Sequence, residues 1–175
     1  MFSTILFVIV VLIVIVFALA ANKPDTFRIQ RSTSINATTE QVFALLDDFH
    51  HWSAWSPWEK MDPGMKRTHS GATKGKGAIY EWEGNKKVGT GRMEIIDITP
   101  NTVLRIKLDF FAPFEAHNTA EFTLENGSGL VTLTWAMYGP ASFPLKIMHL
   151  FMNMDQMVGK DFENGLANLK SLAEK

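Results

Sequence analysis

The N-terminal stretch Phe2–Ala21 constrains this chain most, because it contains no charged residue and only two hydroxyl side chains. At ~1.5 Å per residue, about twenty helical residues span roughly 30 Å, the thickness of a bilayer core. A helix that is apolar on every face has no stable place on the surface of a water-soluble domain. We therefore expect residues 1–22 to form one transmembrane anchor.

A secretory signal peptide is the alternative interpretation of the same stretch. Ala18-Leu19-Ala20 followed by Ala21 is a small-x-small pattern, which would place cleavage after Ala20. However, no Lys or Arg precedes the apolar run, and the run is longer than the usual hydrophobic region of ~7–15 residues. The length and the flanks favour a retained anchor and leave cleavage open.

Charges beside the anchor predict its orientation. Lys23, Arg28 and Arg31 follow it, whereas the α-amino group is the only positive charge before it. Because positive charge concentrates on the cytoplasmic side, we expect a single-pass membrane protein whose domain faces the cytoplasm. The chain has no cysteine, which excludes a disulfide framework but fits either side of the membrane. A formal net charge of −1 disfavours nucleic acid as the main partner.

Residues 23–175 are enough for one domain. Alternation and a β-rich composition predict a first strand over Thr26–Ile35, and a capping sequence at 36–40 predicts a helix after it. Pro57 interrupts the aromatic segment 50–58, so this segment cannot be one regular helix. Its tryptophans, Trp52, Trp55 and Trp58, recur every third residue and would line one side of a helical or 3₁₀ stretch.

The middle of the chain predicts antiparallel strands separated by turns, with Asn126–Gly129 as the strongest hairpin signal. The expected strands are 78–83, 88–99, 102–110, 116–124 and 130–138. Phe143–Ala173 then predicts one long helix that opens near Pro144. Strands grouped together with segregated helices indicate an α+β domain. A long helix across a curved sheet leaves a concavity of the kind that holds small molecules.

Three groups of residues resemble a known family in their order and spacing. They are Arg31–Ala37 with Val42-Phe43; Trp52, Trp55–Trp58, Gly75–Ala78, Tyr80, Trp82 and Gly84-Asn85; and Gly159–Glu163, Gly165-Leu166 and Leu169-Lys170. Together they resemble the START-like (SRPBCC) superfamily, its polyketide cyclase/dehydrase-like branch and the membrane-anchored bacterial members of that branch. The resemblance implies a helix-grip fold, in which a curved antiparallel sheet wraps around a long C-terminal helix behind one transmembrane helix. It further implies a bacterial inner-membrane location and a ligand pocket over residues 23–175, and it leaves the activity open.

Large apolar side chains are the candidates for the pocket wall, although ordinary core packing explains any single aromatic residue as well. Asp155 interrupts the apolar stripe of the last helix, where it would either face the cavity or pair with a basic residue at the edge. Met148 and Met152 belong to a Met-rich segment that could adapt to a ligand or fill the core. The predicted pocket residues are Trp52, Trp55, Tyr80, Trp82, Phe110, Trp135, Met148, Met152 and Asp155.

No catalytic, metal or cofactor site is predicted. The adjacent pair His50-His51 lacks the i, i+4 spacing of a helical metal pair, and no cysteine is available to complete a zinc site. No Gly-x-Ser-x-Gly elbow occurs. The Gly pairs at 75–77 and 89–91 do not continue into a phosphate loop and predict strand ends or bulges.

These observations favour an anchored binding module for a hydrophobic small molecule or lipid, with no cofactor. An alternative is a cyclase or dehydratase acting on an aromatic or polyketide-like substrate, which would need an acid or base inside the cavity. Asp155, Tyr80 and Glu81 are the sequence candidates for that role. A third hypothesis is a protein-interaction module that uses the sheet edge or the Trp-rich segment. The ligand and the oligomeric state stay open.

Overall fold

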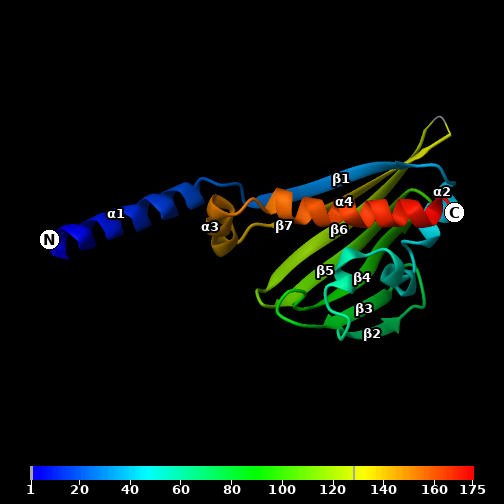
Figure 1. Cartoon of the computed structure of the whole chain (residues 1–175), viewed down its shortest axis with the longest axis horizontal. Helices are drawn as coiled ribbons and strands as arrows, with labels where there is room; N and C mark the ends of the chain where they lie inside the picture. The colour runs from blue at the N-terminus through cyan, green and yellow to red at the C-terminus, as the bar shows by residue number, and fades with distance from the viewer. Residues whose placement is uncertain (1, 128) are drawn as a thin grey trace.

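A computed structural model describes residues 2–127 and 129–175, so Ser128 of the predicted 126–129 turn lies outside the described residues. An apolar helix extends from one α+β domain (Figure 1). The elements are α1 (Phe2–Ala21), β1 (Thr26–Ile35), α2 (Thr39–Ala44), the 3₁₀ turns η1 (Phe49–Ala54) and η2 (Pro57–Lys60), β2 (Lys66–Gly71), β3 (Ala78–Glu83), β4 (Thr90–Thr99), β5 (Val103–Ala112), β6 (Ala116–Asn126), β7 (Val131–Pro140), α3 (Phe143–Phe151) and α4 (Met154–Ala173).

Within the described residues, the strands form a single antiparallel sheet in the order β1-β7-β6-β5-β4-β3-β2. Thr26 at the start of β1 pairs with Pro140 at the end of β7. Phe110 pairs with Ala116 across the β5–β6 turn, which lies at the same end of the sheet because Thr119 pairs with Tyr138. We call this end, next to α1 and α3, the anchor end, and the opposite one the far end (Figure 1).

The α4 helix lies across the concave face and packs along β1 (Figure 1). Its buried face is Gly159, Phe162, Gly165, Leu166 and Leu169, a spacing of three and four residues that keeps one side of a helix against the sheet. The capping box that opens α2 uses Thr38 and Gln41. The predicted α+β, helix-grip architecture is therefore confirmed.

The prediction of one helix over Phe143–Ala173 is wrong, because the helix breaks after Phe151. Met152 is extended, and the Asn153 side chain accepts a hydrogen bond from the Gln156 amide to cap α4. A short polar side chain that satisfies the free amides of a new helix favours a start at that point. The strand β2 was not predicted, because its residues are mostly exposed and show no apolar alternation.

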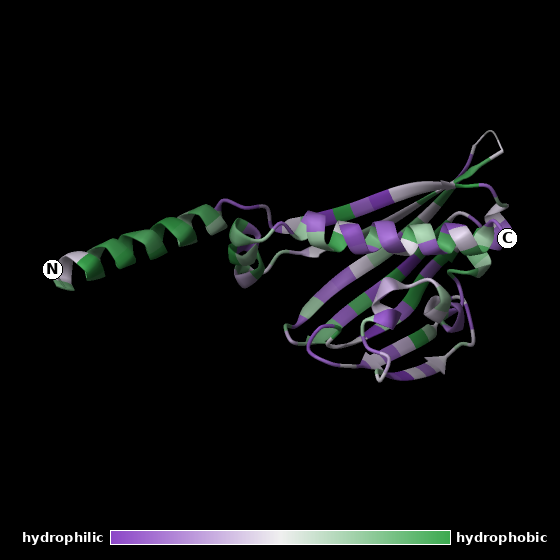
Figure 2. Ribbon diagram, viewed as in Figure 1, coloured by the Kyte–Doolittle hydropathy of each residue, from purple (hydrophilic) through white to green (hydrophobic). Residues whose placement is uncertain are grey.

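Almost the whole of α1 is exposed, and Ala20 is its one buried residue among those described. Figure 2 shows it as a largely hydrophobic helix that projects from a domain in which hydrophobic and hydrophilic residues are mixed. It is long and apolar enough to cross a membrane, and a signal sequence would have the same character.

Candidate functional site

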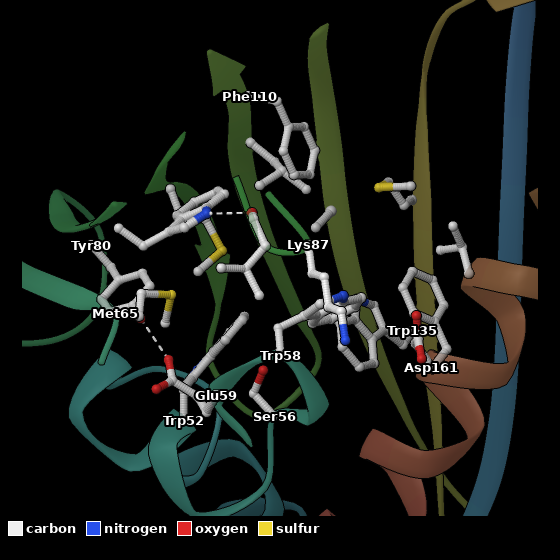
Figure 3. Close-up of a pocket in the computed structure, with 18 residues that line it drawn as sticks. Trp52, Ser56, Trp58, Glu59, Met65, Tyr80, Lys87, Phe110, Trp135 and Asp161 are labelled. Carbon is white, nitrogen blue, oxygen red and sulfur yellow. Dashed lines mark hydrogen bonds between the residues drawn. The ribbon is translucent and has the colours of Figure 1, made fainter. Parts of the chain in front are cut away.

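A cavity of about 260 Å³ lies between the concave face of the sheet, the η1–η2 segment and α4 (Figure 3). Strand periodicity builds one wall, since alternate residues of a strand share a face. This places Tyr80 and Trp82 of β3 on the same face as Leu108 and Phe110 of β5, with β4 between the two strands. The full lining is Trp52, Ser56, Trp58, Glu59, Met65, Tyr80, Trp82, Lys87, Val88, Met93, Leu108, Phe110, Ala120, Trp135, Met137, Val158, Asp161 and Phe162.

Aromatic rings fix the shape of the wall. The rings of Trp135 and Phe162 stack with centroids 4.2 Å apart, which joins β7 to α4. Trp58 meets Trp135 edge-on at 5.5 Å. On the other side of the cavity, Trp82 meets Phe110 edge-on at 5.7 Å. Such rigid contacts hold the wall in place, so the cavity is largely preformed.

One polar cluster enters this apolar wall at Glu59. The Tyr80 hydroxyl donates to Glu59 Oε1 at 2.5 Å (Figure 3), and Arg67 Nε donates to Glu59 Oε2 at 2.6 Å. Burial, followed by the hydrogen bond to Glu59, raises the pKa of Tyr80. Both carboxylate oxygens of Glu59 thus accept a bond, and Tyr80 stays a neutral donor. This arrangement compensates the half-buried charge of Glu59. It leaves the Glu59 carboxylate little capacity to accept a proton.

Two further polar features border the cavity. Asp161 of α4 is half-buried, and burial raises the pKa of its carboxyl. Among the described residues, Trp135 Nε1 is the one buried side-chain nitrogen or oxygen without a hydrogen-bond partner. An unsatisfied buried donor costs roughly 1–3 kcal/mol. Trp135 thus keeps an indole N–H unpaired within the packed interior, and Asp161 is a carboxyl that burial disfavours as an anion.

The structure brings five of the nine predicted pocket residues to the cavity, namely Trp52, Tyr80, Trp82, Phe110 and Trp135. Trp55 lies behind the wall, fully buried, with its indole N–H donating to the Leu45 carbonyl. Met148 is half-buried on α3, and Met152 is exposed at the break between the helices. Neither methionine lines the cavity.

Asp155 lies outside the cavity, where Arg31 of β1 binds it. The guanidinium crosses Gly159, where an added Cβ would lie 2.1 Å from Arg31 Nη2. The same arginine donates to Glu163, and its hydrogen bond lowers the pKa of Asp155. Of the two alternatives that the sequence left open, pairing at the edge is the one seen. Glu81 is exposed on the other face of β3.

Sequence reasoning missed Ser56, Trp58, Glu59, Lys87 and Asp161 as lining residues. Asp161 had a signal, since it lies three residues after Val158 and one before Phe162, within the arc that faces the sheet. Glu59 had no such sequence signal, because its hydrogen-bond partners Arg67 and Tyr80 lie on β2 and β3. Over residues 2–127 and 129–175, no three His, Cys, Asp or Glu side chains are grouped closely enough to hold a metal ion.

The geometry fits what comparison with known families finds. Residues 26–174 match the family described as polyketide cyclase / dehydrase and lipid transport. The chain belongs to this family. The resemblance to the polyketide cyclase/dehydrase-like branch is thereby confirmed, and it supports a ligand-binding module. No curated protein sequence matches the chain.

Solved structures share the fold at low sequence identity. A Chromobacterium violaceum protein is 16% identical, with a TM-score of 0.59, over 87% of this chain and 99% of its own. The Aha1 dimer from Colwellia psychrerythraea is 14% identical, with a TM-score of 0.58, over 85% and 96%. The di-domain ARO/CYC BexL from the BE-7585A biosynthetic pathway is 14% identical, with a TM-score of 0.61, over 90% and 53%. Such distant likenesses establish the fold and leave function to the site.

Proposed function

We propose that this protein is a membrane-anchored binding module that takes up a hydrophobic small molecule or a lipid in the cavity beside α4. The observation that carries the proposal is the apolar, aromatic cavity, whose Glu59 carboxylate is already satisfied by Tyr80 and Arg67. Ligand sites are concave, mostly apolar and equipped with a few polar groups that orient the ligand. At about 260 Å³, the cavity suits a small molecule or part of a lipid chain.

In this proposal residues 1–22 are the anchor and residues 23–175 the binding domain, on the cytoplasmic side of a bacterial inner membrane. An anchored pocket meets membrane-partitioned molecules at a high effective concentration. The half-buried Asp161, whose pKa is raised by burial, disfavours an anionic group of the ligand beside it.

The test is native mass spectrometry of the full-length protein extracted in detergent, followed by denaturation and identification of any released molecule. Ala120→Leu fills the cavity from β6, where Ala120 lines the wall. Thr119→Leu is the matched control, because adjacent strand residues face opposite sides of the sheet. We expect a bound apolar molecule that Ala120→Leu displaces and Thr119→Leu retains. An empty protein that also fails to bind a fluorescent apolar dye would contradict the proposal.

A cyclase or dehydratase is the second candidate, and Asp161 is the observation that favours it. This carboxyl borders the cavity, its pKa is raised by burial, and raised carboxyl pKa values suit acid–base catalysis near neutral pH. Asp161→Asn distinguishes the two functions once the bound molecule is known. Retained binding with lost conversion of that molecule would favour the enzyme, whereas a molecule recovered unchanged from the unmodified protein would favour the carrier.

A further inference from the structure

The helix α3 leaves apolar side chains exposed at both of its ends, while its most buried side chain is polar. Its polar side chains Lys146 and His149 face the domain: Lys146 binds the Asp25 carboxylate, and His149 lies against Phe27 with ring centroids 6.2 Å apart. Lys146 is its one buried residue among those described. Phe143 and Phe151, at its two ends, are 43% and 72% exposed. The other apolar side chains of α3 are half-buried, and α3 packs against α1, so its two exposed phenylalanines are what still lacks apolar cover.

The position of α3 relative to α1 identifies that cover. Phe17 lies four residues before the end of α1, or ~6 Å along the helix axis, and its ring is 5.6 Å from that of Phe143. If α1 spans the bilayer, Phe17 lies at the edge of the hydrocarbon, and Phe143 lies beside it. The five steps from Ala21 to Thr26 reach at most ~18 Å, so the anchor end of the domain stays at the bilayer surface.

A second exposed apolar group lies at the same end of the sheet. The β5–β6 turn, taken with the last two residues of β5 as residues 111–115, carries Phe111, 51% exposed, and Phe114, 72% exposed. Glu115 in this turn contacts His117 at 3.2 Å. Lys86 is exposed on the neighbouring β3–β4 turn, which approaches Pro113 through Gly89, whereas Lys87 of the same turn lines the cavity. Aromatic side chains flanked by lysines are typical of surfaces that bind the lipid headgroup region.

We infer that α3 and the β5–β6 turn (residues 111–115) form a docking surface for the lipid headgroup region. This inference rests on the proposed role of α1 as a transmembrane anchor. The docked domain holds the cavity close to the bilayer, because Phe110 and Met137 line it two and three residues from the anchor-end termini of β5 and β7. A hydrophobic ligand would then travel a short path between the lipid and the cavity.

Site-directed spin labelling tests the surface directly, because the chain has no cysteine and each substitution creates a unique label site. Full-length Phe151→Cys, Phe114→Cys, Val11→Cys and Glu125→Cys would be labelled with a nitroxide and reconstituted into vesicles of phosphatidylcholine and phosphatidylglycerol. Collision rates with oxygen, which enters the bilayer, and with a water-soluble nickel chelate give the depth of each label. All four side chains are exposed, so the labels should leave the fold intact, and circular dichroism checks this.

We expect the labels at 151 and 114 to lie roughly 5–10 Å within the interface, as for interfacial helices. The label at 11 should lie in the hydrocarbon, and the label at 125, on the far end, in water. A label at 11 in lipid with 151 and 114 as accessible to nickel as 125 would overturn docking while keeping the anchor. A label at 11 in water would overturn both. Lipid contact at 151 alone would remove the β5–β6 turn from the surface.

Discussion

The two ends of the concave face are built from the same sheet yet packed differently. At the far end, Ile35, Leu124, Val131, Leu133 and Leu169 are buried to 3% exposure or less, and α4 covers them with a stripe of apolar side chains. Toward the anchor end, the cover is the η1–η2 segment and the first turns of α4, and the cavity lies there. The regular apolar stripe of a helix covers the sheet without a gap at the far end. The short irregular η1–η2 segment, with its large aromatic rings, leaves a cavity against the sheet.

Trp135 marks the boundary between the two regions. Its ring stacks on Phe122 at 5.0 Å and on Phe162 at 4.2 Å, and it also lines the cavity. The far end therefore serves as the rigid support of the cavity wall. Matched substitutions at the two ends can test whether the far end mainly stabilises the fold and the anchor end mainly holds the cavity.

The largest expected difference in unfolding free energy is between two leucine-to-alanine substitutions. Leu133→Ala removes a fully buried side chain at the far end, and we expect a loss near ~5 kcal/mol of unfolding free energy. Leu108→Ala removes a cavity-lining side chain with fewer neighbours, so the loss should be near ~2 kcal/mol. Urea denaturation of the full-length protein in detergent, followed by tryptophan fluorescence, measures both. Equal losses would mean that the cavity wall is packed as tightly as the far end.

A smaller contrast is expected at two glycines of α4. At Gly165 an added Cβ would lie 2.8 Å from the Trp135 ring and 3.1 Å from Pro57, and neither ring can yield easily. Gly165→Ala should therefore cost about 1–3 kcal/mol through overpacking. At Gly159 the nearest atoms all belong to the Arg31 guanidinium, which can shift at the modest cost of its exposed ion pairs with Asp155 and Glu163, while the helix gains up to ~1 kcal/mol of propensity. Thermal unfolding should rank Gly165→Ala as clearly less stable than Gly159→Ala, and the reverse order would contradict this packing.

The regular parts of the molecule follow from the sequence, and the binding region follows only in part. Alternation in 104–110 and the spacing of Phe162, Leu166 and Leu169 predict the packed elements because burial imposes those periods. The Glu59 cluster was not predictable, since it depends on β2, a strand whose residues lack any apolar pattern. The place of Asp155 in the apolar stripe wrongly predicted a pocket residue. Asp155 lies over Arg31 at the edge, a contact that helical spacing alone cannot reveal.

The smallest expected effect is a difference in pH dependence between two aspartates of α4. Burial raises the folded-state pKa of Asp161 above its ordinary 3.8, so the folded state binds its proton more tightly than the unfolded state does. This destabilising contribution is absent below about pH 3.8 and grows as pH rises through the folded pKa. Asp161→Asn removes it, so the variant should unfold at a higher temperature than the unmodified protein at neutral pH and lose that advantage in acid.

Asp155→Asn is the matched control with the opposite sign. The hydrogen bond from Arg31 lowers the pKa of Asp155, so its stabilising contribution is present above pH 3.8 and is lost as pH falls through the folded pKa. The control should therefore unfold at a lower temperature than the unmodified protein at neutral pH and approach it in acid. Melting temperatures across this pH range compare the pair. If both variants lose stability at neutral pH, Asp161 is a paired structural carboxylate and not one that burial destabilises.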